Sequence, residues 1–243
     1  MNIVTLNMWG TSGPFEERWN FFIEELKRLK PKLLCLQEVW DGNLPERIKK
    51  TLNLPYSASS YESGLVLLAQ DPIVSHWIST YRARSVLEDY DRRALIVRLK
   101  LGAQEVTVAN THLSWKPEDS ETRSRQVDQL LHEVEVIGSP ALLAGDFNDV
   151  PQSPAIQKIV RAGYQDLFQL IHPAEEGFTW DNTHPFVQTH EVKLPDRRID
   201  FLFVDRTILK LHSVEACDIV FHRPNAKGVY PSDHYGLLAR LRF

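Results

Sequence analysis

The 243-residue chain has only two cysteines, no excess of positive charge and no long apolar run. Cys35 and Cys217 both lie within apolar segments, which is typical of buried thiols and excludes a fold stapled by disulfides. The formal net charge of −4 argues against DNA binding through a broad basic surface. The chain opens on an apolar segment with no room for a signal peptide, and no stretch is long enough to span a membrane. We therefore expect an intracellular, cytoplasmic protein without a transmembrane segment.

Several catalytic motifs with strong local signatures are also missing. The sequence contains no GxSxG elbow, no GxxxxGK[ST] phosphate loop, no CxxC pair, no HExxH motif and no GxGxxG fingerprint. These absences argue against covalent catalysis by serine or cysteine and against nucleotide-driven motion. An oxygen-rich set of polar residues without cysteine pairs also favours Mg²⁺ or Mn²⁺ over Zn²⁺ as a bound metal.

The apolar residues, 43% of the chain, are distributed as short runs and amphipathic stretches. The spacing predicts helices over 15–30, 44–52, 127–137 and 153–162, and strands over 2–8, 33–37, 64–70, 78–83, 92–101, 106–113, 141–148, 197–204, 213–221 and 236–243. There is no internal repeat and no composition break, so we expect one domain over 1–243. Two packed mixed sheets with helices outside, a layered α/β (α+β) sandwich, account best for this order of elements.

Polar residues interrupt or follow several of these apolar runs. They are Asn7, Glu38, His112, Asp146 with Asn148, Asp200, and Asp233 with His234. Carboxylates and imidazoles at the mouths of buried strands are costly unless they converge on something charged. A divalent cation and a phosphate group together would satisfy this set.

Glu38 is the natural primary ligand for a hard divalent cation, because its carboxylate follows a buried strand directly. The amide oxygen of Asn7 is a second ligand or orients the substrate. Asp146 and Asn148, two residues apart in GDFND, can orient one water and one phosphate oxygen together. A solvated strand end at Glu38 and an Asx-type turn in GDFND are the corresponding structural alternatives.

Asp200 and His234 form the second candidate group. An aspartate that accepts a hydrogen bond from one imidazole nitrogen fixes the tautomer and raises the basicity of the other nitrogen. Such a pair acts as a general base or stabilises a charged phosphoryl oxygen. Six other histidines lack a partner pattern of this kind and are interpreted as structural or solvated: His76, His132, His172, His190, His212 and His222.

The order Asn7, Glu38, His112, Asp146-x-Asn148, Asp200, Asp233-His234 resembles the endonuclease/exonuclease/phosphatase superfamily of metal-dependent phosphohydrolases, across essentially the whole chain. The resemblance implies a four-layer αββα sandwich. It also implies Glu38 as main metal ligand, with Asn7 assisting and Asp233 beside the metal. Asp146 and Asn148 would position the attacking water and the scissile phosphate, while His112 and His234, the latter oriented by Asp200, stabilise the phosphoryl oxygens. The reaction implied is direct in-line attack of water without a covalent intermediate.

The substrates of this superfamily range widely, so the fold does not settle the substrate. FTWDNTH and PSDHYGLLARL resemble the 5′-end tyrosyl-DNA phosphodiesterases, which would imply a nucleic-acid end as phosphodiester substrate and a role in DNA repair. A sphingomyelinase-like or inositol-phosphate phosphatase-like hydrolase is the alternative, since GDFND is followed by Val150-Pro151 and lacks the arginine of those enzymes. A non-catalytic binding module on the same fold is the third hypothesis, and no protein partner is evident.

Two further residues are assigned to the substrate. Trp180 is expected to stack on a base or ring, with packing in the core or a lid as the alternative. Arg198 is expected to contact phosphate, with an ion pair that holds Asp200 as the alternative. The other candidates for phosphate or backbone contacts, for which a solvated surface position is the stronger alternative, are Arg92, Arg93, Arg123, Arg125 and Arg197.

Overall fold

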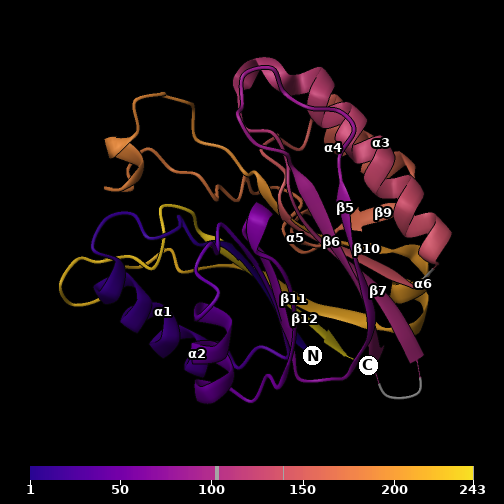
Figure 1. The fold of residues 1–243 in the computed structure, drawn as a ribbon, viewed down its shortest axis with the longest axis horizontal. Helices are drawn as coiled ribbons and strands as arrows, with labels where there is room; N and C mark the ends of the chain where they lie inside the picture. The colour runs from indigo at the N-terminus through magenta and orange to yellow at the C-terminus, as the bar shows by residue number, and fades with distance from the viewer. Residues whose placement is uncertain (102–103, 139, 243) are drawn as a thin grey trace.

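The computed structural model describes residues 1–101, 104–138 and 140–242 and contains two six-stranded sheets (Figure 1). The first sheet has the order β11-β12-β1-β2-β4-β3, and the second has the order β5-β6-β7-β8-β10-β9. The strands of the first sheet are β1 (Asn2–Asn7), β2 (Leu33–Gln37), β3 (Tyr56–Ser60), β4 (Leu65–Ala69), β11 (Ser213–Val220) and β12 (Gly236–Arg242). Those of the second are β5 (Ile73–Thr80), β6 (Arg93–Leu101), β7 (Gln104–His112), β8 (Ala141–Asp146), β9 (Tyr164–Asp166) and β10 (Asp200–Asp205).

Helices cover the outer face of each sheet, which confirms the predicted αββα sandwich (Figure 1). The helices α1 (Phe15–Leu29) and α2 (Leu44–Thr51) pack on the first sheet, and α3 (Ser120–Ile137) and α4 (Pro154–Arg161) pack on the second. The shorter helices are α5 (Leu167–Ile171), α6 (Arg206–Leu211) and the 3₁₀ turns η1 (Tyr61–Ser63), η2 (Pro117–Asp119) and η3 (Val187–Thr189). In the described part of the chain, no helix has the length and apolar character to cross a bilayer.

Some predicted boundaries were wrong where the periodicity was weak. The strand expected over 78–83 lies earlier, as β5, and α3 begins at Ser120 rather than at residue 127. β5 is an edge strand with several exposed positions, so its alternation does not mark one buried face. The predicted last strand is β12, and Phe243 lies outside the described residues.

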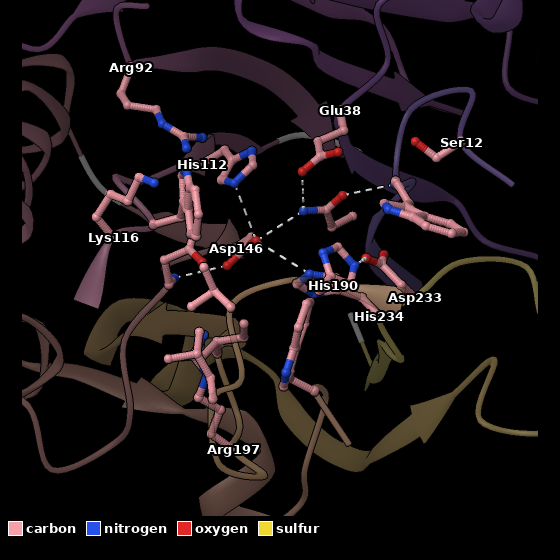
Figure 2. A pocket seen from close by; sticks show the side chains of 18 of the residues that line it. Ser12, Glu38, Arg92, His112, Lys116, Asp146, His190, Arg197, Asp233 and His234 are labelled. Carbon is pink, nitrogen blue, oxygen red and sulfur yellow. Dashed lines mark hydrogen bonds and ion pairs between the residues drawn. The ribbon is translucent and has the colours of Figure 1, made fainter. Parts of the chain in front are cut away.

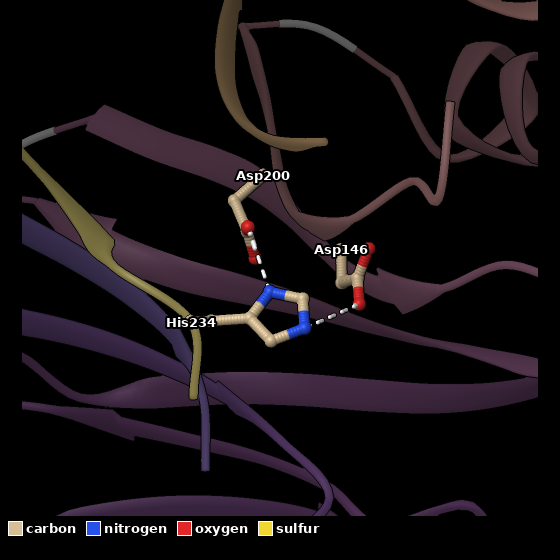
Figure 3. Close-up of side chains that lie close together, drawn as sticks. All are labelled: Asp146, Asp200 and His234. Atoms are coloured by element: carbon tan, nitrogen blue, oxygen red, sulfur yellow. Dashed lines mark hydrogen bonds and ion pairs between the residues drawn. The ribbon is translucent and has the colours of Figure 1, made fainter. Parts of the chain in front are cut away.

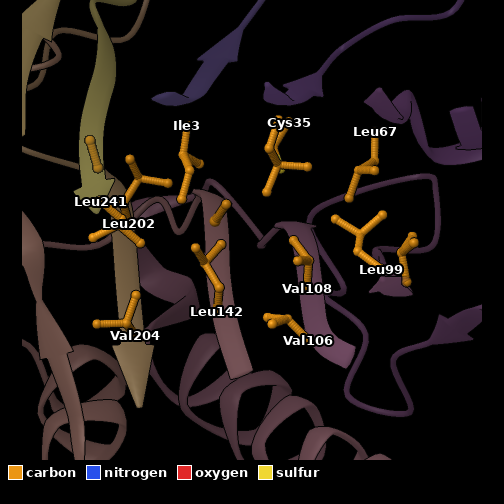
Figure 4. Close-up of a cluster of buried hydrophobic side chains, with 14 of the residues drawn as sticks. Ile3, Cys35, Leu67, Leu99, Val106, Val108, Leu142, Leu202, Val204 and Leu241 are labelled. Carbon is orange, nitrogen blue, oxygen red and sulfur yellow. The ribbon is translucent and has the colours of Figure 1, made fainter. Parts of the chain in front are cut away.

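Side-chain alternation along the strands builds three apolar layers. In β1, Ile3 faces the core between the sheets, while Val4 and Leu6 face α1. In β8, Leu142 and Ala144 face the core between the sheets in the same way. Figure 4 shows this central layer, to which both sheets contribute. Because burial alternates with a period of two, the next inward positions along these strands lie at the end of the central core.

The central core becomes polar at one end. Asn110 of β7 donates from Nδ2 to the carbonyl oxygens of Leu36 (2.9 Å) and Val66 (3.0 Å) in the opposite sheet. Its Oδ1 accepts a hydrogen bond of 2.7 Å from Gln37 Nε2. These buried hydrogen bonds join the two sheets directly, so they fix how the strand ends of one sheet face those of the other.

Gly145 lets β7 and β8 approach closely beside the polar end. A Cβ at this position would lie 2.0 Å from the carbonyl oxygen of Thr111, and the backbone φ is +135°. The neighbouring pair in the same parallel register is His112 and Asp146.

We expect Gly145→Ala to lower the free energy of unfolding by about 3 kcal/mol or more, because the methyl group forces the two strands apart and strains the backbone. Gly42→Ala is the matched control, since its Cβ would meet only ordinary contacts at 3.7 Å or more. Urea unfolding of both variants would measure the difference. Equal stability of the two variants would contradict this account of the β7–β8 contact.

Candidate active site

The ends of three adjacent strands bring the predicted residues of the second sheet together. In the parallel β7–β8 pair His112 lies opposite Asp146, and in the antiparallel β10–β8 pair Asp200 lies opposite Asp146. All three side chains occupy inward positions and are at most 6% exposed. Asp146 is therefore the central residue of a row that the sheet register itself assembles.

Asn7 of the first sheet connects this row to Glu38. Its amide nitrogen donates one hydrogen bond of 3.0 Å to Glu38 Oε1 and a second of 3.0 Å to Asp146 Oδ2 (Figure 2). Its amide oxygen accepts a hydrogen bond from the backbone N–H of Trp9. In this arrangement the amide nitrogen of Asn7 faces both carboxylates, and its role as a metal ligand stays a prediction. Asn7 holds two carboxylates in place.

Glu38 reaches the site only through an unusual backbone conformation. Strand alternation would place it on the outer face with Leu34 and Leu36, but its φ is +57°. This left-handed conformation turns the carboxylate back toward Asn7. The conformation costs about 1–3 kcal/mol for a residue other than glycine and is a feature of functional sites. Gly64 makes room for the turn, since a Cβ there would lie 3.0 Å from Glu38 Cα.

His234 is held as a cation. Its Nδ1 lies 3.0 Å from Asp200 Oδ2, and its Nε2 lies 3.9 Å from Asp146 Oδ2 (Figure 3). Burial opposes protonation, but Asp200 above all, and then Asp146 and Asp233, raise the pKa of His234 to about 10. Both ring nitrogens therefore carry protons at neutral pH, and Nε2 is a donor directed toward Asp146.

His112 differs from His234 in charge. Burial is the main reason that the pKa of His112 lies well below its ordinary value, and the positive charges of Arg92 and His234 lower it further. His112 is therefore neutral at pH 7, with Nε2 at 3.4 Å from Asp146 Oδ2. The carboxylate of Asp146 thus lies near two imidazole rings, of which that of His234 is charged and that of His112 is neutral.

Asn148 also has a left-handed backbone, with φ of +51°. Its N–H donates to Asp146 Oδ1 at 2.9 Å, and its side-chain Nδ2 donates to the carbonyl oxygen of Leu113 at 2.9 Å. The Asx-type turn is therefore present, and it fixes both side chains at the cleft.

The crowded carboxylates fit a hard divalent cation. Burial, together with Asp233, raises the pKa of Glu38, and burial, together with Asp200, raises the pKa of Asp146 to about 7. A cation beside Glu38 and Asp146 would relieve both effects, and carboxylate oxygens are the ligands that Mg²⁺ prefers. Ligand atoms of Asp146, Asp200 and His234 also lie within 4.8 Å of one another. The protonated imidazole already supplies positive charge there, so the Glu38 side is the better place for a metal.

Asp233 has a partner that the sequence did not reveal. His190 Nε2 lies 2.8 Å from Asp233 Oδ2, and the Ser232 hydroxyl lies 3.1 Å from Oδ1. Burial alone would raise the pKa of Asp233, but the hydrogen bond from His190 and the charge of His234 bring it below the ordinary value. His190 was expected to be structural or solvated. It is a structural partner of Asp233 that also lines the cleft and packs between Trp9 and Trp180.

Arg198 does not reach the cleft. The residue is 2% exposed, and its guanidinium donates to Asp166 Oδ2 at 2.7 Å, between the rings of Phe168 and Phe201. Both predictions for Arg198 were therefore wrong, because it contacts neither the site nor Asp200 but stabilises the end of β9. The neighbouring Arg197 lines the cleft instead. Arg197 rather than Arg198 faces the cleft because the side chains of adjacent residues in an extended segment point to opposite sides.

The cleft around these residues has a volume of about 570 Å³. Trp180 lies in its wall but is only 8% exposed, and its ring meets that of His234 edge-on at 5.1 Å. Trp180 thus packs against His234 more than it offers a free stacking face. The cleft is also lined by residues for which no role was predicted, Trp9, Tyr90, Trp115 and Lys116, and by residues for which a structural or solvated position was the stronger expectation, Arg92, His190 and Arg197. Most lie in loops without periodic spacing, so no local signal marked them.

Arg92 and Arg123 were expected to be solvated, but both are buried. Arg92 pairs with Glu88 through Nε at 3.0 Å and lies over the ring of Tyr90. Arg123 pairs with Asp149 at 2.9 Å. Arg125 is solvated as predicted, since its ion pair with Glu121 is exposed.

Comparisons with known proteins agree with this geometry. The model of the Endonuclease/Exonuclease/phosphatase family matches residues 4–234. Protein angel of Drosophila melanogaster is 28% identical over 253 residues, which cover 92% of this chain and 71% of that protein. Protein angel homolog 2 of Danio rerio is 31% identical over 163 residues, 58% of this chain and 29% of that protein. The matched region is thus under a third of the zebrafish relative.

Solved structures share the fold at low sequence identity. D. rerio TDP2, solved as a complex with a single-strand DNA product, superposes with a TM-score of 0.82 at 17% identity, covering 100% of this chain and 99% of that chain. Truncated Caenorhabditis elegans TDP2 gives a TM-score of 0.79 at 20% identity, covering 100% and 97%. At these identities the likeness concerns the fold.

We expect Asp200→Asn to lower the pKa of His234 from about 10 toward its ordinary value of 6.5, because the largest favourable charge is removed. The folded-state pKa is raised, so the protonated ring contributes stability that is complete below pH 6.5 and is lost as the pH rises through about 10. The stability difference between wild type and variant should therefore shrink across this interval.

NMR titration of the His234 ring and urea unfolding at several pH values would measure both effects. The resonance of the exposed His132 serves as the internal control and should be the same in both proteins. An unchanged His234 titration in Asp200→Asn would contradict the assigned pair.

Proposed function

Because the chain belongs to the endonuclease/exonuclease/phosphatase family and is a phosphoester hydrolase, we propose that it is a Mg²⁺-dependent phosphodiesterase acting on nucleic-acid ends. One observation carries the proposal. A continuous set of contacts runs from Asp200 through His234 to Asp146, and from Asp146 through Asn7 to Glu38. This set combines a cationic donor, a carboxylate of raised pKa and a carboxylate suited to a metal in one cleft.

The cleft residues have separate roles in an in-line displacement by water. Asp146 and Asn148 orient the attacking water, and Asp146, with a pKa of about 7, accepts its proton near neutral pH. The protonated Nε2 of His234 and the neutral ring of His112 donate to the phosphoryl oxygens, where negative charge increases in the transition state. A Mg²⁺ ion beside Glu38, with Mn²⁺ as the substitute, would act as Lewis acid and template for the phosphate.

A nucleic-acid end is the favoured substrate. TDP2, whose fold this chain shares, was solved with a single-strand DNA product. A 5′-tyrosyl-DNA phosphodiesterase activity or a related exonuclease or endonuclease activity is consistent with that likeness, and DNA repair would be its context. The cleft supplies cationic residues together with aromatic ones, which suits phosphates joined to bases.

A lipid substrate is the second candidate, on one observation. Val86, Leu87 and Tyr90 are 95%, 49% and 44% exposed in the loop before β6, and Tyr90 lines the cleft. An exposed apolar rim beside the cleft is the feature that a sphingomyelinase-like enzyme would use at a membrane surface.

Glu38→Gln should reduce Mg²⁺-dependent hydrolysis of bis(p-nitrophenyl) phosphate by about 10²-fold or more, because a preorganised charge contact is lost. The same variant should lose most of the rise in melting temperature that Mg²⁺ gives the wild type. Glu24→Gln on the exposed face of α1 is the control and should behave as wild type. Activity and metal-induced stabilisation retained in Glu38→Gln would contradict the metal site.

Turnover across 5′-tyrosyl DNA, abasic DNA, RNA, sphingomyelin and inositol phosphates would test the substrate class. We expect hydrolysis of the nucleic acids to exceed that of the lipids and inositol phosphates at least tenfold in kcat/KM. Val86→Ser combined with Leu87→Ser should leave nucleic-acid turnover unchanged. A large loss with sphingomyelin vesicles in that double variant would instead favour the lipid candidate.

A further inference from the structure

A buried arginine of α1 binds two loops that border the cleft. Arg18 is 1% exposed, and its five hydrogen bonds in the described structure all go to backbone carbonyl oxygens. One of these is the carbonyl oxygen of Pro231, at 2.7 Å, in the loop before β12. The other four belong to the loop after β1: Met8 (2.9 Å), Trp9 (3.5 Å), Gly10 (3.0 Å) and Ser12 (3.0 Å). A single guanidinium therefore joins loops from opposite ends of the sequence.

These hydrogen bonds hold an unfavourable turn in the loop after β1. Trp9 and Gly10 both have a left-handed backbone, with φ of +54° and +48°. A bulky residue in this conformation is strained, and the conformation persists only where the surrounding structure imposes it. Arg18 imposes it here, because it binds the carbonyl oxygens of both residues. The guanidinium carbon also lies 5.0 Å from the ring centroid of Trp9.

The turn determines which end of the Asn7 amide faces the carboxylates. The backbone N–H of Trp9 donates to Asn7 Oδ1 at 3.0 Å, so this oxygen is directed to the turn. The amide nitrogen is then directed to Glu38 and Asp146, to which it donates. An amide turned by half a rotation would present its oxygen to two carboxylates and lose these hydrogen bonds. The position of the Trp9 N–H therefore controls the contact between the two carboxylates.

The loop before β12 carries Asp233 and His234, and it is bound to the end of β1 by two separate contacts. One is the hydrogen bond from Arg18 to the carbonyl oxygen of Pro231. The other is the hydrogen bond of 2.6 Å from the Ser232 hydroxyl to the carbonyl oxygen of Asn7. Arg18 thus contributes to the placement of both groups of site residues in the first sheet.

Stability alone gives little reason for a charged residue at this position. Burial lowers the pKa of Arg18 to about 10, and the charges of Asp233 and Glu38 favour its protonated form, so the guanidinium is charged at neutral pH. Burying a charge costs free energy, and well-packed apolar residues in place of buried charges often leave stability unchanged or improve it. An apolar side chain could not bind several carbonyl oxygens in a fixed planar geometry.

We propose that Arg18 is a positioning residue for the hydrolytic reaction: by fixing the turn at Trp9 and Gly10, it sets the orientation of the Asn7 amide and the place of the loop that carries Asp233. The inference rests on the proposed function and adds a residue to it. Arg18 does not line the cleft in the described structure, so it acts through the backbone of the two loops.

Arg18→Lys keeps the charge and loses the planar arrangement of donors. It should lower kcat for bis(p-nitrophenyl) phosphate by about 10²-fold, the effect of a misplaced catalytic group, and change KM by less than about threefold. Arg28→Lys, on the exposed side of the same helix, is the matched control and should behave as wild type. Melting curves of both variants measure their stability separately.

A second variant tests the planar geometry by chemical rescue. Guanidinium ion at millimolar concentration should raise kcat of Arg18→Ala at least about tenfold, because one well-placed charge-assisted contact is worth about that much. Methylammonium, which carries the same charge without the planar donors, should give no such gain.

An NMR measurement in EDTA tests the positioning without turnover. The side-chain amide of Asn7 donates to two carboxylates, so its proton resonances should lie downfield of those of the exposed Asn53. In Arg18→Lys these resonances should move toward those of Asn53 and exchange faster with water. In Arg28→Lys they should stay as in wild type.

Unchanged Asn7 resonances in Arg18→Lys would overturn the inference, as would a melting temperature that falls while kcat matches wild type. A folded Arg18→Ala that guanidinium does not rescue would overturn it also. If Arg18→Ala does not fold, the resonances of Arg18→Lys decide the question. Displaced Asn7 resonances in Arg18→Lys, together with a wild type that hydrolyses no phosphodiester, would refute the proposed function alone.

Discussion

The site depends on the burial of several carboxylates at one end of the core between two sheets. Asp146 and Asp200 face the core between the sheets, and the other side chains of β8 and β10 that face this core are apolar. Ionised groups in such surroundings need compensating charge or hydrogen bonds. His234, held as a cation, compensates one side, and the amide of Asn7 holds the other.

The two sheets contribute in similar ways. In each, two parallel neighbouring strands that are joined through a covering helix end at the cleft: β1 and β2 through α1 in one sheet, and β7 and β8 through α3 in the other. Parallel strands joined by a helix end at the same edge of a sheet. The hydrogen bonds of Asn110 across the core set the two edges against each other, so the carboxylates of both sheets reach the same small volume.

Two residues next to the cleft have a strained backbone where the regular strand geometry ends. Glu38 and Asn148 are both left-handed, at the ends of β2 and β8. The rest of the fold outweighs this cost, and in return two side chains are directed into the cleft. The segment 181–196 closes one wall, since Phe186 stacks on Trp9 at 5.0 Å and His190 contacts Asp233. A residue of a long irregular loop thus becomes part of the site.

The sequence by itself determined the layered fold and the polar strand ends, because alternating burial and helical spacing are local properties of the chain. It also pointed to the pairing of Asp200 with His234. Only the tertiary structure decided that Asn7 presents its nitrogen to the carboxylates, that His190 holds Asp233, and that Arg197 rather than Arg198 faces the cleft. The reason is physical. Loop paths, amide orientation and the direction of an extended segment depend on partners far away in the chain, and no local pattern specifies them.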